Sequence, residues 1–411
     1  MKAIVVGGGI GGLTTALMLA RRGIDCTVYE QSPKLRELGV GITLMPTAVR
    51  ELAALGLLAA LEAASVSSAH LHYKTRRGQT VWDEPRGRAA GHDVPQLFVH
   101  RGRLLGLLAE AAEAQLAPGS IRLGQRLVSV DQDATGVTAR FVDAYGASAS
   151  ETGDLLIGAD GIYSPTRATL HPDEGAPRWS GLMMWRGAAD WPAFLGGASL
   201  LILGGVDAKL VIYPIGPSGV PGRRLTNWVV IVRVAPDGSP APARADWARE
   251  GSRDALAPHL GLFHCTEVDA AGLVAASPAI WEYAMFDRDP VVFWSRGRVT
   301  LLGDAAHPMY PMGANGATQA ILDARSLAEA LVGTADIPAA LADYQAARLP
   351  VTSQIVHANR RGGPEAVIDA VERLAPDGFV SVDAVLSRAD RQAILQGYAQ
   401  TVGLTTQQGA R

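Results

Sequence analysis

One segment near the end of the sequence places an acid, an imidazole and two glycines between an apolar run and an amphipathic run. In RVTLLGDAAHPMYPMGANGATQAILDA, residues 298–324, Asp304 and His307 follow the apolar run, and Gly313 and Gly316 precede the amphipathic one. An aspartate at the carboxyl end of a buried strand needs hydrogen-bond donors, and ligands gather at that end of a parallel sheet. A helix that begins after glycines offers unpaired N–H groups to a ligand. The segment therefore predicts a ligand-binding loop.

Two of these side chains have simpler alternative roles. Asp304 could cap the following helix and contact no ligand. His307 could act as a catalytic base or as a structural hydrogen-bonding residue of the loop. We favour the structural role, because neither the pKa of His307 nor its neighbours can be read from the sequence.

The amino-terminal sequence contains the pattern GxGxxG at Gly7, Gly9 and Gly12. It lies between AIVV, typical of a buried strand, and LTTALMLARRG, typical of a helix. Such glycines permit a tight turn, a close approach to a pyrophosphate and close packing of helix on strand. CTVYE follows as a second strand and ends at Glu30, where a carboxylate can bind a ribose. The pattern predicts a dinucleotide-binding βαβ unit, with a purely structural βαβ unit as the alternative.

The remaining pattern predicts an α/β fold in which a Rossmann-like domain is interrupted by a mostly antiparallel β-sheet domain and followed by a helical region. Residues 69–84 read as a hairpin that turns near Gly78, and several short strands follow residue 176. Pro350 is expected to kink or break a helix. The predicted dinucleotide domain comprises residues 1–68, 98–175 and 283–360. The predicted substrate domain comprises residues 69–97 and 176–282, and a helical tail comprises residues 361–411.

Composition excludes several other classes of protein. The chain has 411 residues, 48% of them hydrophobic, and a net charge of −3, so no basic field indicates nucleic acid or an anionic membrane. Its two cysteines, Cys26 and Cys265, are far apart, which argues against a disulfide framework or a zinc site and fits a reducing cytoplasm. Glycines interrupt the apolar amino-terminal run, which argues against a signal peptide. We expect no membrane span.

Three motifs occur in a family-specific order: GxGxxG with Glu30, GADG at 158–161 followed by Ser164 and Arg167, and GDAAH at 303–307. Together they resemble the single-component FAD-dependent aromatic hydroxylases, from residue 1 to about residue 360. Shorter motifs, among them MWRG at 184–187, YPI at 213–215 and DRDP at 287–290, resemble the phenazine-carboxylate hydroxylases within that family.

The resemblance implies an FAD-binding domain and a monooxygenase. NADH or NADPH, as a transient reductant, would reduce FAD, and a flavin C4a-hydroperoxide would hydroxylate an aromatic or polycyclic aromatic substrate such as a phenazine carboxylate. Hydroxylation at the carbon that bears a carboxylate would also remove that carboxylate. The alternatives are a hydroxylase of another phenolic or polyketide compound, a flavin oxidase that does not hydroxylate, and a non-catalytic binding module. The absence of WxWxIP argues against a halogenase. The expected partners are the aromatic substrate and molecular oxygen, and a homodimer is left open.

The resemblance also assigns site residues. The predicted FAD contacts are Gly7, Gly9, Ile10, Gly11, Gly12, Glu30, Gln31, Arg36, Gly41, Arg101, Leu127, Asp160, Asp304, Gly313, Ala314, Asn315 and Gly316. The predicted substrate contacts are Met184, Trp185, Tyr213 and Pro311. No catalytic residue and no metal ligand is assigned.

Structural alternatives remain for four of the residues discussed. Leu127 could be a core residue of its strand, Asp160 a turn residue and Trp185 a core residue of the second domain. Arg186 could pair with a substrate carboxylate or brace the sheet, and we favour bracing. The final 26 residues carry no chemical signal.

Overall fold

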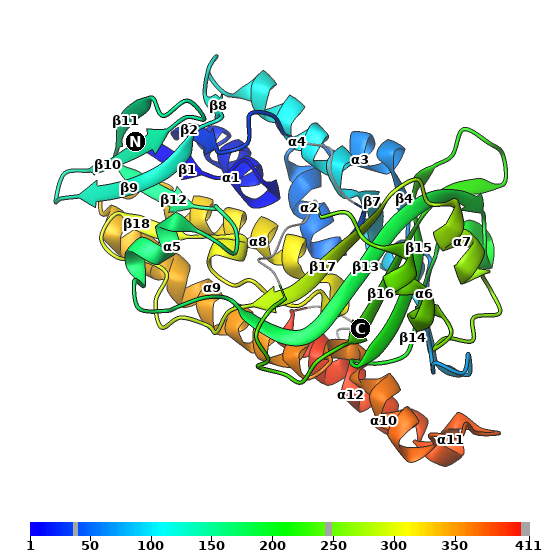
Figure 1. Cartoon of the computed structure of the whole chain (residues 1–411). Helices are drawn as coiled ribbons and strands as arrows, with labels where there is room; N and C mark the ends of the chain where they lie inside the picture. The colour runs from blue at the N-terminus through cyan, green and yellow to red at the C-terminus, as the bar shows by residue number, and fades with distance from the viewer. Residues whose placement is uncertain (36–39, 243–248, 404–411) are drawn as a thin grey trace, which may run out of the picture.

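The protein is represented by a computed structural model, which describes residues 1–35, 40–242 and 249–403. A five-stranded parallel sheet forms one half (Figure 1), in the order β18 (Val299–Leu301), β12 (Leu155–Gly158), β1 (Lys2–Val6), β2 (Asp25–Glu30) and β8 (Ile121–Leu123). The strands β1, β12 and β18 are short runs rich in Val, Ile and Leu and are almost entirely buried, as expected for parallel strands covered on both faces. The α/β class predicted from the sequence is confirmed.

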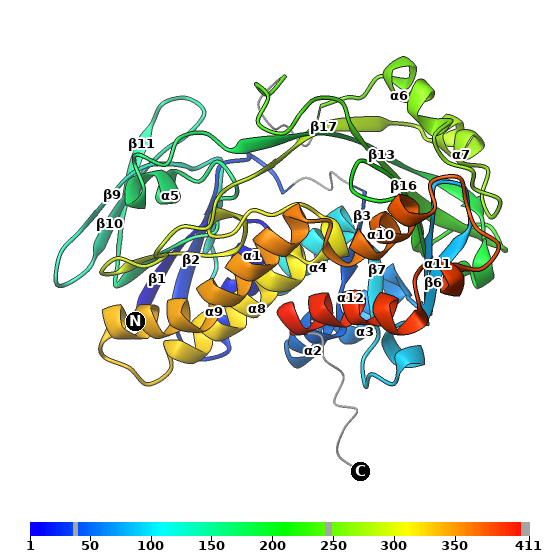
Figure 2. The ribbon, with the colours of Figure 1, turned by 90° about the horizontal axis from the view of Figure 1, so that it is seen from below.

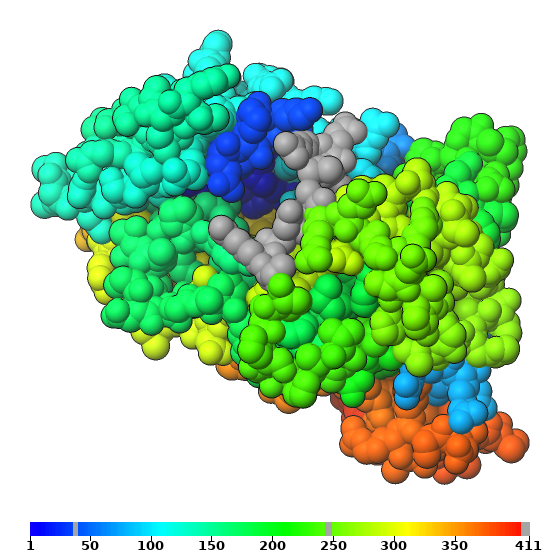
Figure 3. Space-filling model, viewed as in Figure 1, coloured from blue at the N-terminus to red at the C-terminus, as the bar shows by residue number. Residues whose placement is uncertain are grey.

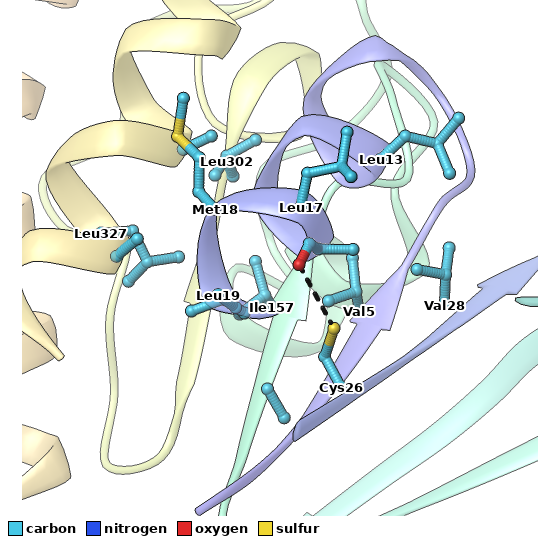
Figure 4. Packing of buried hydrophobic residues seen from close by; sticks show 14 of the residues in the cluster. Val5, Leu13, Leu17, Met18, Leu19, Cys26, Val28, Ile157, Leu302 and Leu327 are labelled. Atoms are coloured by element: carbon cyan, nitrogen blue, oxygen red, sulfur yellow. Dashed lines mark hydrogen bonds between the residues drawn. The ribbon is translucent and has the colours of Figure 1, made fainter. Parts of the chain in front are cut away.

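The helix α1 (Ile10–Ala20) covers this sheet and packs against α4 (Arg101–Gln115) and α8 (Gly316–Ala330). Figure 4 shows Leu17 and Leu19 of α1 near Val5 of β1 and Ile157 of β12. In the same core, Cys26 Sγ donates a hydrogen bond to the Ala16 carbonyl oxygen over 3.6 Å. Burial, together with the charge of Asp25, raises the pKa of the Cys26 thiol to about 12, so this cysteine is an unreactive core residue.

Two small antiparallel sheets flank the parallel one. The first contains β9 (Arg126–Gln132), β10 (Val137–Val142) and β11 (Ser148–Gly153), and the second contains β3 (Gly41–Leu44), β7 (Leu97–His100) and β4 (Ser65–Ser67). Short helices accompany them: α2 (Pro46–Ala54), α3 (Leu58–Ala64) and α5 (Pro165–Leu170). Ser164 caps α5, since its Oγ accepts a hydrogen bond from the Arg167 amide over 2.8 Å.

A seven-stranded sheet forms the other half. Its order is β17 (Ile280–Asp287), β13 (Arg178–Pro192), β16 (Arg223–Arg233), β15 (Ala208–Pro217), β14 (Ser199–Leu203), β5 (His70–Lys74) and β6 (Thr80–Pro85). Only the β14–β5 pair is parallel among its pairs. Two helices, α6 (Arg253–Leu260) and α7 (Ala270–Ala276), pack on β16 and β13. In the space-filling view, amino-terminal residues (blue) lie recessed between the two halves (Figure 3).

The carboxyl-terminal helices are α9 (Ile337–Arg360), α10 (Ala366–Leu374), α11 (Val382–Val385) and α12 (Arg388–Thr401). Figure 2 shows α9, α10 and α12 on one face of the molecule, and α12 contacts both of the others. The helix α9 continues through Pro350, so of the two expected effects of this proline, a kink or a break, the break is wrong. Tertiary packing of α9 against α8 outweighs the loss of one backbone hydrogen bond.

One sequence-based boundary differs from the structure. The strand β17 crosses the expected domain boundary at residue 283, because it pairs with β13 up to Asp287. The helix α6 begins at Arg253, where the Ser252 hydroxyl caps it by accepting a hydrogen bond from the Ala255 amide over 3.2 Å. In the described part of the chain, no helix is both long and apolar enough to cross a membrane.

Candidate active site

The glycines after β1 form a cradle whose members have different tasks. Gly7 has φ of +108°, and a Cβ on it would lie 2.2 Å from the Ala159 carbonyl oxygen. A Cβ on Gly12 would lie 1.9 Å from the Gly7 carbonyl oxygen, so both positions require glycine for packing. In contrast, a Cβ on Gly9 would meet no described atom within 4 Å. Gly9 therefore leaves open space in front of the amino terminus of α1.

That amino terminus suits an anion. No described side chain caps α1, and its first turn carries no acidic residue, so its N–H groups and the positive end of its dipole face the open space. Glu30 lies beside it, with its carboxylate accepting hydrogen bonds from the amides of Gly8 and Ser32, each over 2.8 Å. A carboxylate has lone pairs for further donors, so this arrangement leaves Glu30 able to bind a ribose hydroxyl. Gln31 is exposed just after β2, and Arg36 lies outside the described residues.

A cavity of about 670 Å³ extends from this cradle to the seven-stranded sheet. Gly9, Ile10 and Gly11 line one part of it, together with Gly41 and Arg101. Gly41 approaches the sheet closely: its amide donates to the Asn227 Oδ1 over 2.8 Å, and a Cβ there would lie 2.5 Å from the side chain of Ile215. This cavity therefore lies between the two halves of the protein.

One face of the seven-stranded sheet forms the far wall of this cavity. Successive side chains of a strand point to opposite faces. Accordingly, Met184 and Arg186 of β13 line the cavity, as do Lys209, Val211 and Tyr213 of β15. Alternate residues of β5, β6, β14 and β16 extend the wall in the same way. Met184 and Tyr213 thus lie where the sequence placed substrate contacts.

Trp185 does not lie where the sequence placed it. Its side chain points to the opposite face of β13 and packs against the His259 ring, with 5.1 Å between ring centroids. It is not among the described residues that line the cavity. The alternation along β13 requires this, because Met184 and Arg186 on either side face inward. Trp185 is therefore a core residue, which was the alternative role considered for it from the sequence.

Asp304 lies deep in the protein but is exposed to the cavity, at the end of β18. Burial raises the pKa of its carboxyl group, while the charges of His307 and Arg101 oppose that shift. Burial likewise lowers the pKa of Arg101, and Asp304 opposes that shift. The two groups therefore place one negative and one positive charge on the cavity wall near the cradle, where a ligand with hydroxyl and phosphate groups would find an acceptor and a donor.

The loop after Asp304 brings a second helix terminus to the cavity. Gly313 and Ala314 both have positive φ, +65° and +53°, which is costly for alanine and marks a backbone held in place by its surroundings. Pro311, Gly313, Ala314 and Gly316 line the cavity, and no described side chain caps α8. The positive end of the α8 dipole therefore faces the cavity and can stabilise negative charge there.

His307 belongs to a buried network whose side chains are not among the described residues that line the cavity. Its Nε2 lies 2.5 Å from Asp323 Oδ2, and Asp323 Oδ1 accepts from Arg348 Nε over 2.7 Å. Asp323 also accepts from the Gly303 amide over 3.1 Å. This network fixes the turn that carries Asp304, in agreement with the structural role favoured for His307.

Comparison with known proteins agrees with this geometry. A family model described as FAD binding domain matches residues 1–359. This chain belongs to that family. The flavoprotein is 41% identical over 363 residues to phenazine 1,6-dicarboxylic acid hydroxylase PhzS of Lysobacter antibioticus, which covers 87% of this chain and 88% of the relative. It is 32% identical over 382 residues to 3-hydroxybenzoate 6-hydroxylase of Klebsiella oxytoca, which covers 91% and 90% of the two chains.

Solved structures show the same relationship. The flavoprotein matches Klebsiella pneumoniae HpxO, complexed with FAD and uric acid, with a TM-score of 0.76 and 27% identity over 98% of this chain and 97% of that one. A salicylate hydroxylase substrate complex shares the fold, with a TM-score of 0.74 at 22% identity. The protein is an FAD-dependent aromatic hydroxylase, as the order of its three motifs predicted.

The residues present fit FAD. The open space at Gly9 and the uncapped terminus of α1 suit the pyrophosphate, and Arg101 and Asp304 line the same cavity as the amino terminus of α8. Two predicted FAD contacts have tasks of their own in the structure. The Leu127 side chain is in the core of β9. The Asp160 carboxylate accepts from the Ser164 hydroxyl over 2.5 Å and from the Thr166 amide over 3.0 Å, so it orders the turn before α5. Neither is among the described residues that line the cavity.

Nothing in the sequence indicated that the carboxyl-terminal region reaches the site. Glu365 follows α9, and its Oε1 accepts from the Gly313 amide over 3.3 Å. Tyr398 of α12 accepts from Asn315 Nδ2 over 2.9 Å and donates to Asn359 Oδ1 over 2.8 Å. Both Glu365 and Tyr398 line the cavity, whereas the Asn315 side chain is turned toward Tyr398. The helical tail therefore helps to hold the loop that carries Gly313 and Ala314.

Proposed function

We propose that this hydroxylase acts on a polycyclic aromatic acid such as a phenazine carboxylate, with NADH or NADPH as the reductant of FAD. The observation that carries the proposal is Arg186 on the sheet wall of the cavity. Burial, together with the nearby charge of Arg101, lowers the pKa of Arg186 to about 10, so its guanidinium is still protonated at neutral pH. A buried cation that faces a second cation favours an anionic ligand.

The shape and lining of the cavity support a flat aromatic substrate. Val229 and Ile231 of β16 line the cavity beside Met184 of β13, so the wall around Arg186 is apolar. Pro311, on the loop before α8, also lines the cavity. An apolar wall with a few polar groups suits a planar ring system that carries one charged substituent. PhzS, whose name describes a phenazine dicarboxylic acid hydroxylase, is similar to this chain over most of both lengths.

In this proposal the protein supplies binding and electrostatics. Bound FAD would accept a hydride from NADH or NADPH and activate oxygen, so that one oxygen atom enters the aromatic ring and the other leaves as water. The amino terminus of α8 would stabilise negative charge that develops on bound FAD, and Asp304 would accept hydrogen bonds from hydroxyl groups of the cofactor. The apolar wall keeps water out of the cavity. If the attacked carbon bears the carboxylate, carbon dioxide leaves in the same reaction.

Substrate-dependent turnover tests this proposal. Purified FAD-loaded protein is mixed with NADH or NADPH and with phenazine-1-carboxylate, 3-hydroxybenzoate or a neutral polycyclic phenol. We expect phenazine-1-carboxylate to accelerate oxidation of the reduced nicotinamide most, with one hydroxylated product for each nicotinamide oxidised. The matched variant Arg186→Gln should raise KM for the acid at least about tenfold and change KM for the neutral phenol little, because it removes a charge-assisted hydrogen bond. Equal effects on both compounds would contradict the proposal and favour a bracing role for Arg186.

A further inference from the structure

A second charged group lies on the wall of the cavity. Lys209 of β15 is 2% exposed, and its Nζ lies 3.4 Å from Glu365 Oε1, whose side chain is 4% exposed. Glu365 comes from the segment between α9 and α10, so this ion pair joins the sheet to the carboxyl-terminal region. Both residues line the cavity. The pair is therefore buried in the protein and faces the space that a substrate would fill.

The hydrogen-bonding capacity of this pair is only partly used. An ammonium group has three donors, and the closest contact of Lys209 Nζ is the Met312 sulfur at 2.8 Å, a weak acceptor. Glu365 Oε2 is buried and accepts no hydrogen bond from any residue that the structure describes. Buried polar atoms in folded proteins are almost always paired. One strong donor and one strong acceptor therefore point to a polar group that arrives from the cavity.

The charge of the pair limits what that group can be. Lys209 and Glu365 together are neutral, so a carboxylate placed against them would leave one net negative charge in a buried site. An uncharged hydrogen-bond acceptor or a hydroxyl group adds no net charge to the site. Its burial is compensated by the hydrogen bonds that it forms with Lys209 or Glu365. The neutral pair thus differs from Arg186, whose pKa is lowered by the positive charge of Arg101 as well as by burial.

The two groups are spaced to bind one ligand. In the register of the sheet, Arg186 pairs with Val229, which pairs with Val211, and Lys209 lies two residues before Val211 on the same face. The Cα atoms of Arg186 and Lys209 are therefore separated by two strand spacings across the sheet and by two residues along the strand, a distance of roughly 12 Å. Two long side chains can reach toward each other across that span and contact opposite parts of a fused three-ring system.

We infer that Lys209 and Glu365 form a second polar anchor for the aromatic acid, one that recognises an uncharged ring nitrogen or hydroxyl group while Arg186 binds the carboxylate. This inference rests on the proposed function. In the anchor, Lys209 donates to the ring nitrogen or hydroxyl oxygen, and Glu365 balances its charge and accepts from any hydroxyl. The anchor would make the enzyme select heterocyclic or hydroxylated acids over hydrocarbon acids of the same shape.

Binding of two matched acids tests the anchor. Phenazine-1-carboxylate and anthracene-1-carboxylate share shape and charge and differ by two ring nitrogens. Their Kd values are measured on the FAD-loaded, oxidised protein from the change in flavin absorbance, without turnover. We expect the protein to prefer the phenazine at least about tenfold, the effect of one charge-assisted hydrogen bond. Lys209→Met should bring the two Kd values to within about threefold of each other, and Lys209→Arg should restore much of the preference.

Two further variants complete the test. Val211→Ala alters the same wall but leaves Lys209 and Glu365 in place, so it should weaken the binding of both acids equally. Glu365→Gln leaves the ammonium without its counter-charge, so phenazine-1,6-dicarboxylate should gain affinity relative to the monocarboxylate. A phenazine preference that persists in a folded Lys209→Met protein would overturn the anchor. So would equal binding of the two acids by the unmodified protein, although the proposed substrate class would then stand. If the unmodified protein binds neither acid, the substrate class is wrong and the anchor falls with it.

Discussion

Tyr398 of α12 accepts a hydrogen bond from Asn315, the residue before α8, over 2.9 Å. These residues are 83 positions apart in the sequence, and both are buried. The contact ties the carboxyl-terminal helix to the loop at which α8 presents its positive end to the cavity. A helix with no recognisable chemical motif thereby supports the loop that lines the cavity before α8.

Removal of this hydroxyl should weaken FAD binding. Tyr398→Phe leaves Asn315 Nδ2 and Asn359 Oδ1 without this partner, which costs about 1–3 kcal/mol and frees the strained turn at Ala314. We expect a severalfold higher Kd for FAD, measured by quenching of flavin fluorescence. The control Tyr344→Phe removes another buried hydroxyl, which donates to the Leu301 carbonyl oxygen, and should lower stability with less effect on FAD. Unchanged FAD binding in Tyr398→Phe would show that α12 does not support the loop.

Substitutions of the cradle glycines should differ in their effects: one should impair folding, and the other should impair FAD binding. Gly12→Ala forces a Cβ to within 1.9 Å of the Gly7 carbonyl oxygen, so the protein should lose several kcal/mol of stability or fail to fold. Gly9→Ala meets no described atom within 4 Å, so the protein should fold normally. It should nevertheless bind FAD at least about tenfold more weakly, because the methyl group occupies the pyrophosphate space. Urea unfolding and FAD titration measure the two effects. Normal FAD affinity in Gly9→Ala would mean that the pyrophosphate lies elsewhere.

Adjacent residues of β13 should affect different properties. Met184→Ala enlarges the cavity and should change KM for the aromatic acid about threefold to tenfold, with a smaller change in kcat. Trp185→Phe should lower the free energy of unfolding by about 1–2 kcal/mol and leave KM unchanged, because Trp185 packs on the opposite face. Steady-state kinetics and urea unfolding distinguish these outcomes. A KM shift in Trp185→Phe as large as that in Met184→Ala would contradict the assignment of these two side chains to opposite faces of β13.

The network behind Asp304 should stabilise the protein in a defined pH range. Burial would raise the pKa of Asp323, yet His307 and Arg348 outweigh it and lower that pKa to about 2. The folded value lies below the unfolded value of about 4, so this stabilisation is present above pH 4 and is lost as the pH falls toward 2. In Asp323→Asn, the decline of the unfolding free energy between these pH values should be shallower by about 2 kcal/mol.

The exposed pair Arg140–Asp131 offers the control for that measurement. Asp131→Asn should leave the acid part of the stability profile nearly unchanged, because exposed ion pairs contribute little. Denaturant unfolding followed at a series of pH values gives both profiles. If the unfolding free energies of Asp323→Asn, Asp131→Asn and the unmodified protein decline in parallel as the pH falls, the network does not contribute in the way that its geometry indicates.

Local pattern was sufficient to predict the parts of the site that lie within one turn of a strand or helix. GxGxxG and GDAAH each occupy a strand end and the helix that follows, so spacing alone placed Gly9 and Asp304 at the cavity. Trp185 required knowledge of which face of β13 is inward. That is set by pairing with β16 and β17, which are distant in sequence. A one-residue change of register exchanges the two faces, so the sequence left both roles open.

The contributions of Lys209, Glu365 and Tyr398 depend on long-range packing. One signal was available for Lys209: in AKLVIYPIG it is two and four residues from Val211 and Tyr213, so it shares their face of an otherwise apolar strand. Nothing comparable marks Glu365 or Tyr398. Their positions follow from the docking of residues after 360 against α9 and the loop before α8.

Oxygen labelling tests the central claim most directly. The FAD-loaded protein is supplied with NADH or NADPH, phenazine-1-carboxylate and ¹⁸O₂, and the product is analysed by mass spectrometry. The account predicts one ¹⁸O atom in each hydroxylated molecule and none when the label is supplied as H₂¹⁸O. Unchanged phenazine with labelled hydrogen peroxide as the only oxygen product, or a product whose oxygen comes from water, would contradict it.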